Sequence, residues 1–379
     1  MATETTVEPV VGRERRWARK KALSLIDCDV HHIMRSFQDL VPYLDDTHRR
    51  RLQPAISPQA GERTSFRLPR RAYFHPYSSN RGDTMETDGT NHASDPARLK
   101  ADLLDRYGID YVVLLGNDLT TLSGMPDPAL AAGIARAYND WSIDVWLRAD
   151  SRFKLSIWVA PQDPALAAQE IERLGDHPDV VQVAVPQMDI LLGKRHYWPI
   201  YEAAQKHGLP VAFHVGPESA GLNGPQVAVG APTHYIELQT GVVSIGINNV
   251  TSLVCEGVFE KFPDLKTIFL EFGFTWVPGL MWRLDREWKS LRAEVPWVKR
   301  PPSEYILKHV RVGSQPLEEP PHPEYLHQTL EMMSAGETML FATDYPHWDF
   351  DDPKHIIRRI PEHMRQGILV DNARKMYGL

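Results

Sequence analysis

The sequence predicts an α/β fold in which a (β/α)₈ TIM barrel spans most of the chain. Eight short apolar segments alternate with amphipathic helical segments, and this alternation is typical of a parallel sheet. Eight repeats fit a closed barrel, whose functional groups lie at the carboxyl ends of the strands. The chain has 379 residues, which is enough for one large barrel. An open doubly wound sheet would carry a glycine-rich phosphate turn after its first strand, and the sequence has none there.

Each predicted strand is a short apolar run bounded by polar or turn residues. The predicted strands are 23–26, 110–115, 153–159, 180–185, 209–213, 266–270, 309–312 and 338–341. The segments between them have helical spacing, and their ends carry helix signals such as Asp163 before Pro164 and Gly208 after a helix. The predicted helices are 37–51, 96–107, 128–148, 164–174, 197–207 and 276–292, with further helical patterns up to 262 and two helices at the C-terminus.

Three segments have no clear period. Residues 1–20 are charged and are predicted to form a flexible N-terminal tail, so that 21–379 form a single barrel domain. Residues 53–95 and 216–239 are rich in proline and glycine and are predicted to be long insertions after the first and fifth strands. Long loops of this kind commonly wall a functional site.

The composition indicates which kinds of binding partner to expect. The formal net charge of −7 gives no reason to expect nucleic acid or an anionic membrane. No apolar run approaches the ~20 residues of a membrane helix, and the charged N-terminus lacks the apolar core of a signal peptide. Two cysteines cannot form a disulfide framework, which favours a cytoplasmic protein. We expect a small-molecule substrate, no nucleic acid, no membrane, and a possible homo-oligomer.

Polar side chains of metal-ligand type follow four of the predicted strands. Asp29 and His31 come at the end of the first strand, on the same side of an extended chain. His214 follows the fifth strand, Glu271 the sixth and Asp344 the eighth. On a barrel these positions converge on one mouth. Carboxylates and imidazoles that point to one place suit a divalent metal ion.

Five segments in the same order resemble a known family. They are IDCDVHH (26–32), AFHVG (212–216), LEFGFTWVP (270–278), FATDYPH (341–347) and NARKMYGL (372–379). With them the sequence resembles the amidohydrolase superfamily, within it the amidohydrolase-2 group of proteins similar to aminocarboxymuconate-semialdehyde decarboxylase. The resemblance covers 23–379 and implies a barrel of the metal-dependent hydrolase type.

The resemblance also implies roles for individual residues. His31 and His214 match metal-binding histidines, and Asp344 matches an aspartate that binds metal and transfers a proton. The sequence departs from the family at three positions: Asp29 replaces the first histidine of His-x-His, Glu271 stands where a histidine often follows strand six, and Gln187 stands where the carbamylated-lysine subtype has lysine. That two-metal subtype is therefore not expected.

The predicted function is hydrolysis of a small, apolar or aromatic substrate by metal-activated water, with Asp344 and Glu271 as catalytic residues. Zinc is the expected ion, because two imidazoles with carboxylates suit it. Three alternatives stay open: a metal-dependent decarboxylase, a diiron oxygenase in which Glu271 bridges a second metal, and an inert binding module. One or two iron ions are the alternative to zinc.

Four further polar residues at strand ends are candidates for substrate binding or for orienting a ligand: His32, Asn117, Gln315 and His347. His32 is predicted to point away from His31, because successive side chains alternate along an extended chain. Aromatic residues near the predicted mouth support an apolar substrate, and they are Tyr73, Phe74, Tyr77 and Trp348.

Overall fold

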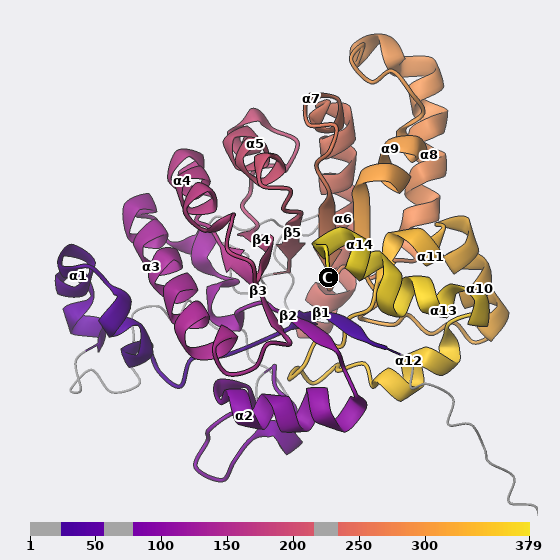
Figure 1. Ribbon diagram of the computed structural model, residues 1–379. Helices are drawn as coiled ribbons and strands as arrows, with labels where there is room; N and C mark the ends of the chain where they lie inside the picture. The colour runs from indigo at the N-terminus through magenta and orange to yellow at the C-terminus, as the bar shows by residue number, and fades with distance from the viewer. Residues whose placement is uncertain (1–23, 57–78, 216–233) are drawn as a thin grey trace, which may run out of the picture.

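The computed structural model describes residues 24–56, 79–215 and 234–379. Within these residues, eight parallel strands follow one another around a barrel in chain order (Figure 1). They are β1 (Ile26–Val30), β2 (Tyr111–Leu114), β3 (Phe153–Trp158), β4 (Val180–Pro186), β5 (Val211–His214), β6 (Thr267–Leu270), β7 (Val310–Gly313) and β8 (Met339–Leu340). The predicted (β/α)₈ barrel is confirmed.

The last and first strands close the barrel through backbone hydrogen bonds. The Cys28 amide donates to the Phe341 carbonyl at 2.9 Å, and the His31 amide donates to the Tyr345 carbonyl at 2.8 Å. A buried carboxylate strengthens this seam, because Asp27 accepts from the Thr343 amide at 3.0 Å and from the Thr343 hydroxyl at 2.5 Å.

Helices surround the barrel on its outer side (Figure 1). They are α1 (Asp46–Ile56), α2 (Pro96–Leu99), α3 (Pro128–Trp141), α4 (Pro164–Leu174), α5 (Trp198–Lys206), α6 (Tyr235–Cys255), α7 (Val258–Lys261), α8 (Trp276–Leu291), α9 (Pro302–His309), α10 (Pro323–Met332), α11 (Ala335–Thr338), α12 (Pro353–Arg359), α13 (Glu362–Gln366) and α14 (Asn372–Tyr377). The Asp163 side chain accepts the first amides of α4, as its position before Pro164 predicts.

Two predicted elements differ from the structure near the N-terminus. The first strand is β1 rather than 23–26, because Asp27 and Asp29 are buried within it and Asp27 is paired with Thr343, which a search for apolar runs cannot detect. The predicted helix 37–51 is split into a 3₁₀ helix, Phe37–Tyr43, and α1. Pro42 lies inside the first piece, and proline disfavours a continuous α-helix.

The predicted tail and parts of both predicted insertions lie outside the described residues. Of the first insertion, 79–95 forms short turns and 3₁₀ helices before α2. The second insertion was predicted to reach 239, but α6 begins at Tyr235. Among the described helices, α6 alone is long and apolar enough to cross a membrane, and half of its most apolar stretch is buried in the protein. Cys28 and Cys255 are both free thiols.

Candidate metal centre

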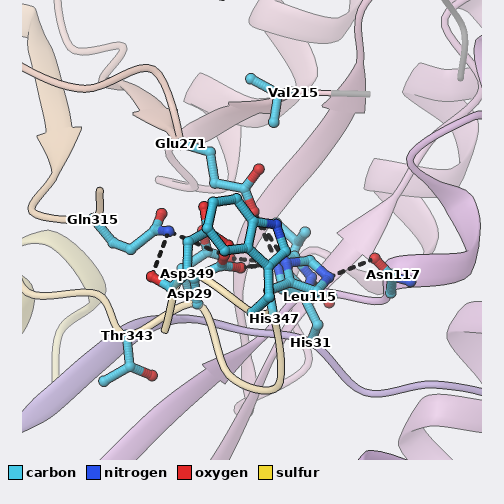
Figure 2. Close-up of polar contacts among 12 residues, drawn as sticks. Asp29, His31, Leu115, Asn117, Val215, Glu271, Gln315, Thr343, His347 and Asp349 are labelled. Carbon is cyan, nitrogen blue, oxygen red and sulfur yellow. Dashed lines mark hydrogen bonds and ion pairs between the residues drawn. The ribbon is translucent and has the colours of Figure 1, made fainter. Parts of the chain in front are cut away.

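Five side chains from the carboxyl ends of four strands meet at the mouth of the barrel (Figure 2). They are Asp29 from β1, His31 directly after β1, His214 from β5, Glu271 directly after β6, and Asp344 after β8. One ligand atom from each lies within 4.8 Å of the others. The structure thus brings together all five residues that the sequence suggested as metal ligands.

The distances between these groups are those of donors around a common ion. His31 Nε2 lies 3.0 Å from Asp344 Oδ1 and 3.5 Å from both Asp29 Oδ1 and Glu271 Oε1. His214 Nε2 lies 3.1 Å from Glu271 Oε1. Both Asp29 oxygens and the Nε2 atoms of His31 and His214 are buried without a hydrogen-bond partner in the described residues. Buried polar atoms seldom lack partners, and a divalent cation would satisfy all four.

Backbone carbonyls orient both histidines. His31 Nδ1 is 3.0 Å from the Leu115 carbonyl, and His214 Nδ1 is 2.6 Å from the Val215 carbonyl. A carbonyl only accepts hydrogen bonds, so each Nδ1 carries a proton, and in the neutral ring Nε2 then presents a lone pair to the centre. Metal-binding histidines are commonly held in this way.

Two of the acidic residues have an unusual backbone conformation. Glu271 has φ of 63° and Asp344 has φ of 60°, both in the left-handed region that residues other than glycine rarely adopt. Such conformations cost about 1–3 kcal/mol each and concentrate at functional sites. These two conformations occur where the carboxylates of Glu271 and Asp344 point from the strand ends into the mouth of the barrel.

Burial and charge shift the protonation of the centre. Burial lowers the pKa of His31 to about 3, and His347 adds to this effect. Burial would also lower the pKa of His214, but Glu271 and Asp29 outweigh it and raise that pKa to about 9. Burial, followed by the charge of Glu271, raises the pKa of Asp344 well above its usual range. Without cations, the buried carboxylates are therefore compensated by protons.

Three other predicted residues also contact the centre. Gln315, after β7, donates from Nε2 to Asp344 Oδ2 at 3.0 Å, and its buried Oε1 has no hydrogen-bond partner among the described residues. His347 Nδ1 is 2.7 Å from Asp344 Oδ1, and His347 Nε2 is 3.2 Å from Asn117 Oδ1. Figure 2 shows Gln315 and Asn117 on opposite sides of the cluster.

His32 points away from the centre, as the alternation of an extended chain predicts. Its Nε2 is 2.8 Å from the Ser142 hydroxyl, and its ring stacks on Trp141 at a centroid distance of 5.6 Å. The structure therefore places His32 in the packing between the barrel and α3. Of the predicted aromatic residues, Tyr73, Phe74 and Tyr77 lie outside the described residues, and Trp348 lies next to Tyr235 with ring centroids 6.4 Å apart.

Two contributors were not identified from the sequence. Asp349 is half-buried in the loop after β8, and burial and then Glu271 raise its pKa. Gln187 contacts the backbone of His214, because Gln187 Nε2 donates to the His214 carbonyl at 3.4 Å. Asn249 of α6 in turn donates to Gln187 Oε1 at 3.0 Å. Three aspartates at 349, 351 and 352 were a visible signal for Asp349, whereas nothing local indicates the contact of Gln187 with α6.

Comparison with known families identifies the barrel. A family model described as amidohydrolase matches residues 26–379. The chain belongs to the amidohydrolase family. The resemblance that five short segments suggested is therefore confirmed over the whole barrel.

This amidohydrolase is similar to several decarboxylases. A gamma-resorcylate decarboxylase from Polaromonas sp. is 25% identical over 295 residues, which cover 73% of this chain and 86% of that protein. The structure of 5-carboxyvanillate decarboxylase from Sphingomonas paucimobilis matches with a TM-score of 0.63 and 21% identity, covering 94% of this chain and 99% of that one. A dihydroxybenzoic acid decarboxylase from Polaromonas sp., solved with manganese and 2-nitroresorcinol, matches with a TM-score of 0.62 and 19% identity, covering 94% and 97%.

The donor set and the family together make this amidohydrolase a metal-dependent enzyme with a divalent-metal site. Manganese is the ion in the solved dihydroxybenzoic acid decarboxylase. The expected zinc and the alternative iron are not confirmed. Neither is hydrolysis, since the similar proteins named above are decarboxylases.

Proposed function

We propose that the protein is a metal-dependent decarboxylase of a hydroxylated aromatic acid. The observation that carries this proposal is the five-donor centre at the mouth of a barrel similar, over 73% of the chain, to a gamma-resorcylate decarboxylase. A divalent ion bound there would hold the substrate's oxygen atoms and stabilise the negative charge that develops on the ring. Asp29, His31, His214 and Asp344 would hold the ion.

The chain's own residues can supply the remaining steps. The bond between the ring carbon and the carboxyl carbon breaks, its electron pair stays on the ring carbon, and carbon dioxide leaves. The ring carbon then takes a proton from the carboxylic acid form of Asp344, and the carboxylate left behind takes up a proton from solvent before the next turnover. Gln315 holds the second oxygen of Asp344, and its partnerless Oε1 can accept a hydrogen bond from a phenolic hydroxyl of the substrate.

The test uses the purified chain loaded with Mn²⁺ and two probes, 2,6-dihydroxybenzoate and 5-carboxyvanillate. We expect carbon dioxide release from at least one hydroxylated probe, no release from unsubstituted benzoate, and loss of turnover after chelation. Absence of carbon dioxide from a panel of hydroxybenzoates, with metal bound, would overturn the proposal. Turnover of aryl esters or lactones by the same sample would restore the hydrolytic prediction.

A second candidate is an oxygenase, favoured by the position of Glu271. Its Oε1 lies 3.5 Å from His31 Nε2, 3.1 Å from His214 Nε2 and 3.3 Å from His347 Nδ1. A carboxylate among three imidazoles resembles the ligands of diiron carboxylate proteins. Such an enzyme would use dioxygen as oxidant and an external two-electron reductant. Oxygen uptake by the iron-loaded chain with reductant, dependent on an organic substrate, would select this candidate.

A further inference from the structure

His347 lies where the carboxylates of Asp344 and Glu271 approach each other. Its Nδ1 is 2.7 Å from Asp344 Oδ1 and 3.3 Å from Glu271 Oε1. Two donors bound to one ion at about 2.1 Å, with a bond angle of about 90° to 109°, are about 3.0–3.4 Å apart. His347 Nδ1 is therefore spaced from Glu271 Oε1 as a second ligand of the same ion would be, and it lies closer than this to Asp344 Oδ1.

The hydrogen bond on the far side of the ring supports this assignment. Asn117 Oδ1 is 3.2 Å from His347 Nε2, and an amide oxygen only accepts hydrogen bonds. When an ion is bound at Nδ1, the proton lies on Nε2 and is donated to Asn117, so Asn117 orients the ring for metal binding; without an ion, Nδ1 donates a hydrogen bond to Asp344 Oδ1, which only accepts. His31 and His214 are held by carbonyls in the same manner. With cations bound, all three imidazoles can thus direct a lone pair toward the same set of carboxylates.

The donors divide into two sides that share Glu271. On one side, His214 Nε2 is 3.1 Å from Glu271 Oε1 and 3.6 Å from Asp29 Oδ2. On the other side, His347 contacts Glu271 and Asp344. The His31 ring lies between them, with centroids 4.8 Å from His214 and 4.4 Å from His347. Paired metal ions in enzymes are about 3.5–4 Å apart, which this arrangement of donors can span.

The charge of the buried carboxylates also favours two metal ions. Asp29, Glu271 and Asp344 are buried or nearly so, and in the resting centre, before Asp344 takes up the proton that it later donates, they carry three negative charges. One divalent ion leaves a charge of −1 in a buried site, where unpaired charge is costly. Two divalent ions leave a net charge of +1. The carboxylate of an aromatic acid, as the proposed function requires, would balance that charge.

We propose that the centre binds two divalent metal ions, and that His347 binds the second through Nδ1. Glu271 is shared between the two ions, Asp344 lies on the side of the second ion, and Asn117 is a positioning residue that orients the His347 ring for binding through Nδ1. This assignment extends the metal centre to six side chains. It rests on the proposed function only for the charge of the substrate.

The experiment measures metal content. The metal-free chain is loaded with Mn²⁺, separated from free metal, and its ions per chain are counted by mass spectrometry. We expect two ions for the wild type and one for His347→Phe, which keeps a ring stacked on His31 but offers no ligand. His355→Ala removes a surface histidine paired with Glu319 and should keep two ions. Thermal unfolding of each variant checks that it is folded.

Spectroscopy and a matched pair at Asn117 provide readouts that a merely structural role would not change. Electron paramagnetic resonance should show a spin-coupled Mn²⁺ pair in the wild type and an isolated ion in His347→Phe. Asn117→Asp keeps an acceptor for Nε2–H and should keep both ions. Asn117→Leu should weaken the second ion about 10- to 100-fold.

Each outcome decides the assignment. One ion per wild-type chain at saturating Mn²⁺, or two ions retained by folded His347→Phe, would overturn it. Equal affinities of Asn117→Leu and Asn117→Asp for the second ion would overturn the positioning role. The proposed function is tested separately: one ion with carbon dioxide release refutes only the second site, whereas two ions without release refute only the decarboxylase.

Discussion

Replacement of Asp344 by asparagine tests the proton-transfer step while keeping the shape of the side chain. Asp344 Oδ1 lies 3.0 Å from His31 Nε2 and 2.7 Å from His347 Nδ1, and Oδ2 accepts from Gln315 Nε2 at 3.0 Å. An asparagine has one acceptor and one donor group. Its amide NH₂ must therefore face either the imidazoles or the Gln315 amide.

The expected magnitude follows from the role. A positioned general acid contributes about 10²- to 10⁴-fold to a rate, which is about 2.7–5.5 kcal/mol of transition-state stabilisation at about 1.36 kcal/mol per factor of ten. We therefore expect Asp344→Asn to lower the rate of carbon dioxide release at least a hundredfold at saturating Mn²⁺. Turnover in D₂O, with deuterium on the vacated ring carbon of the product, reports the protonation step directly.

Two controls make the result interpretable. Metal content of the variant separates a loss of ligand from a loss of proton transfer. Asp351→Asn changes another aspartate of the same loop, whose carboxylate accepts from the Leu317 amide at 2.7 Å, and it should retain activity within about twofold. If metal-loaded Asp344→Asn turned over within tenfold of the wild type, Asp344 would not be the proton donor.

Two further predictions concern the stability of the barrel. Thr343→Val removes the hydroxyl that donates to the buried Asp27 carboxylate, and it should lower the free energy of unfolding by about 1–3 kcal/mol in denaturant titrations. Thr343→Ser keeps the hydroxyl and should not show this loss. Equal stabilities of the two variants would contradict this prediction. His309→Asn can keep the hydrogen bond that His309 Nδ1 makes to the Leu265 carbonyl at 2.8 Å, but it removes a titrating ring. Burial lowers the pKa of His309 to about 4 from 6.5, so between these values the unfolded chain binds a proton that the folded chain does not, and stability is lost as pH falls. The variant should show a shallower loss of unfolding free energy from pH 6.5 to 4, and identical slopes would refute the assignment.

The sequence was sufficient to place the main donors because they obey local rules. Asp29 and His31 are two residues apart on an extended chain, so they share a side whatever the surrounding fold. His214 and Glu271 follow short apolar runs, and the carboxyl ends of barrel strands form one mouth. The predicted end of the first strand fell four residues short of Val30, because the buried Asp27 interrupts the apolar pattern.

The contacts between loops could not be predicted from the sequence. Asn117 meets His347 across 230 positions, and Gln187 meets Asn249 across 62. These pairings depend on how the loops after β2, β4 and β8 fold over the mouth, and no periodicity encodes them. The positive φ angles of Glu271 and Asp344 are likewise imposed by the tertiary structure, since glutamate does not favour a left-handed backbone and aspartate adopts one only in a minority of cases.

The seam between β1 and β8 sets the order in which the protein can become active. Asp27 and Thr343 are 316 positions apart, so the bond between them forms only when nearly the whole chain is available. At about 5–20 residues per second, synthesis of such a chain takes on the order of 20–75 seconds. Throughout that time Asp29 and His31 of the nascent chain lack the carboxylate of Asp344. Firm metal binding is therefore a late event in biosynthesis, and a chain truncated before β8 would lack the complete centre.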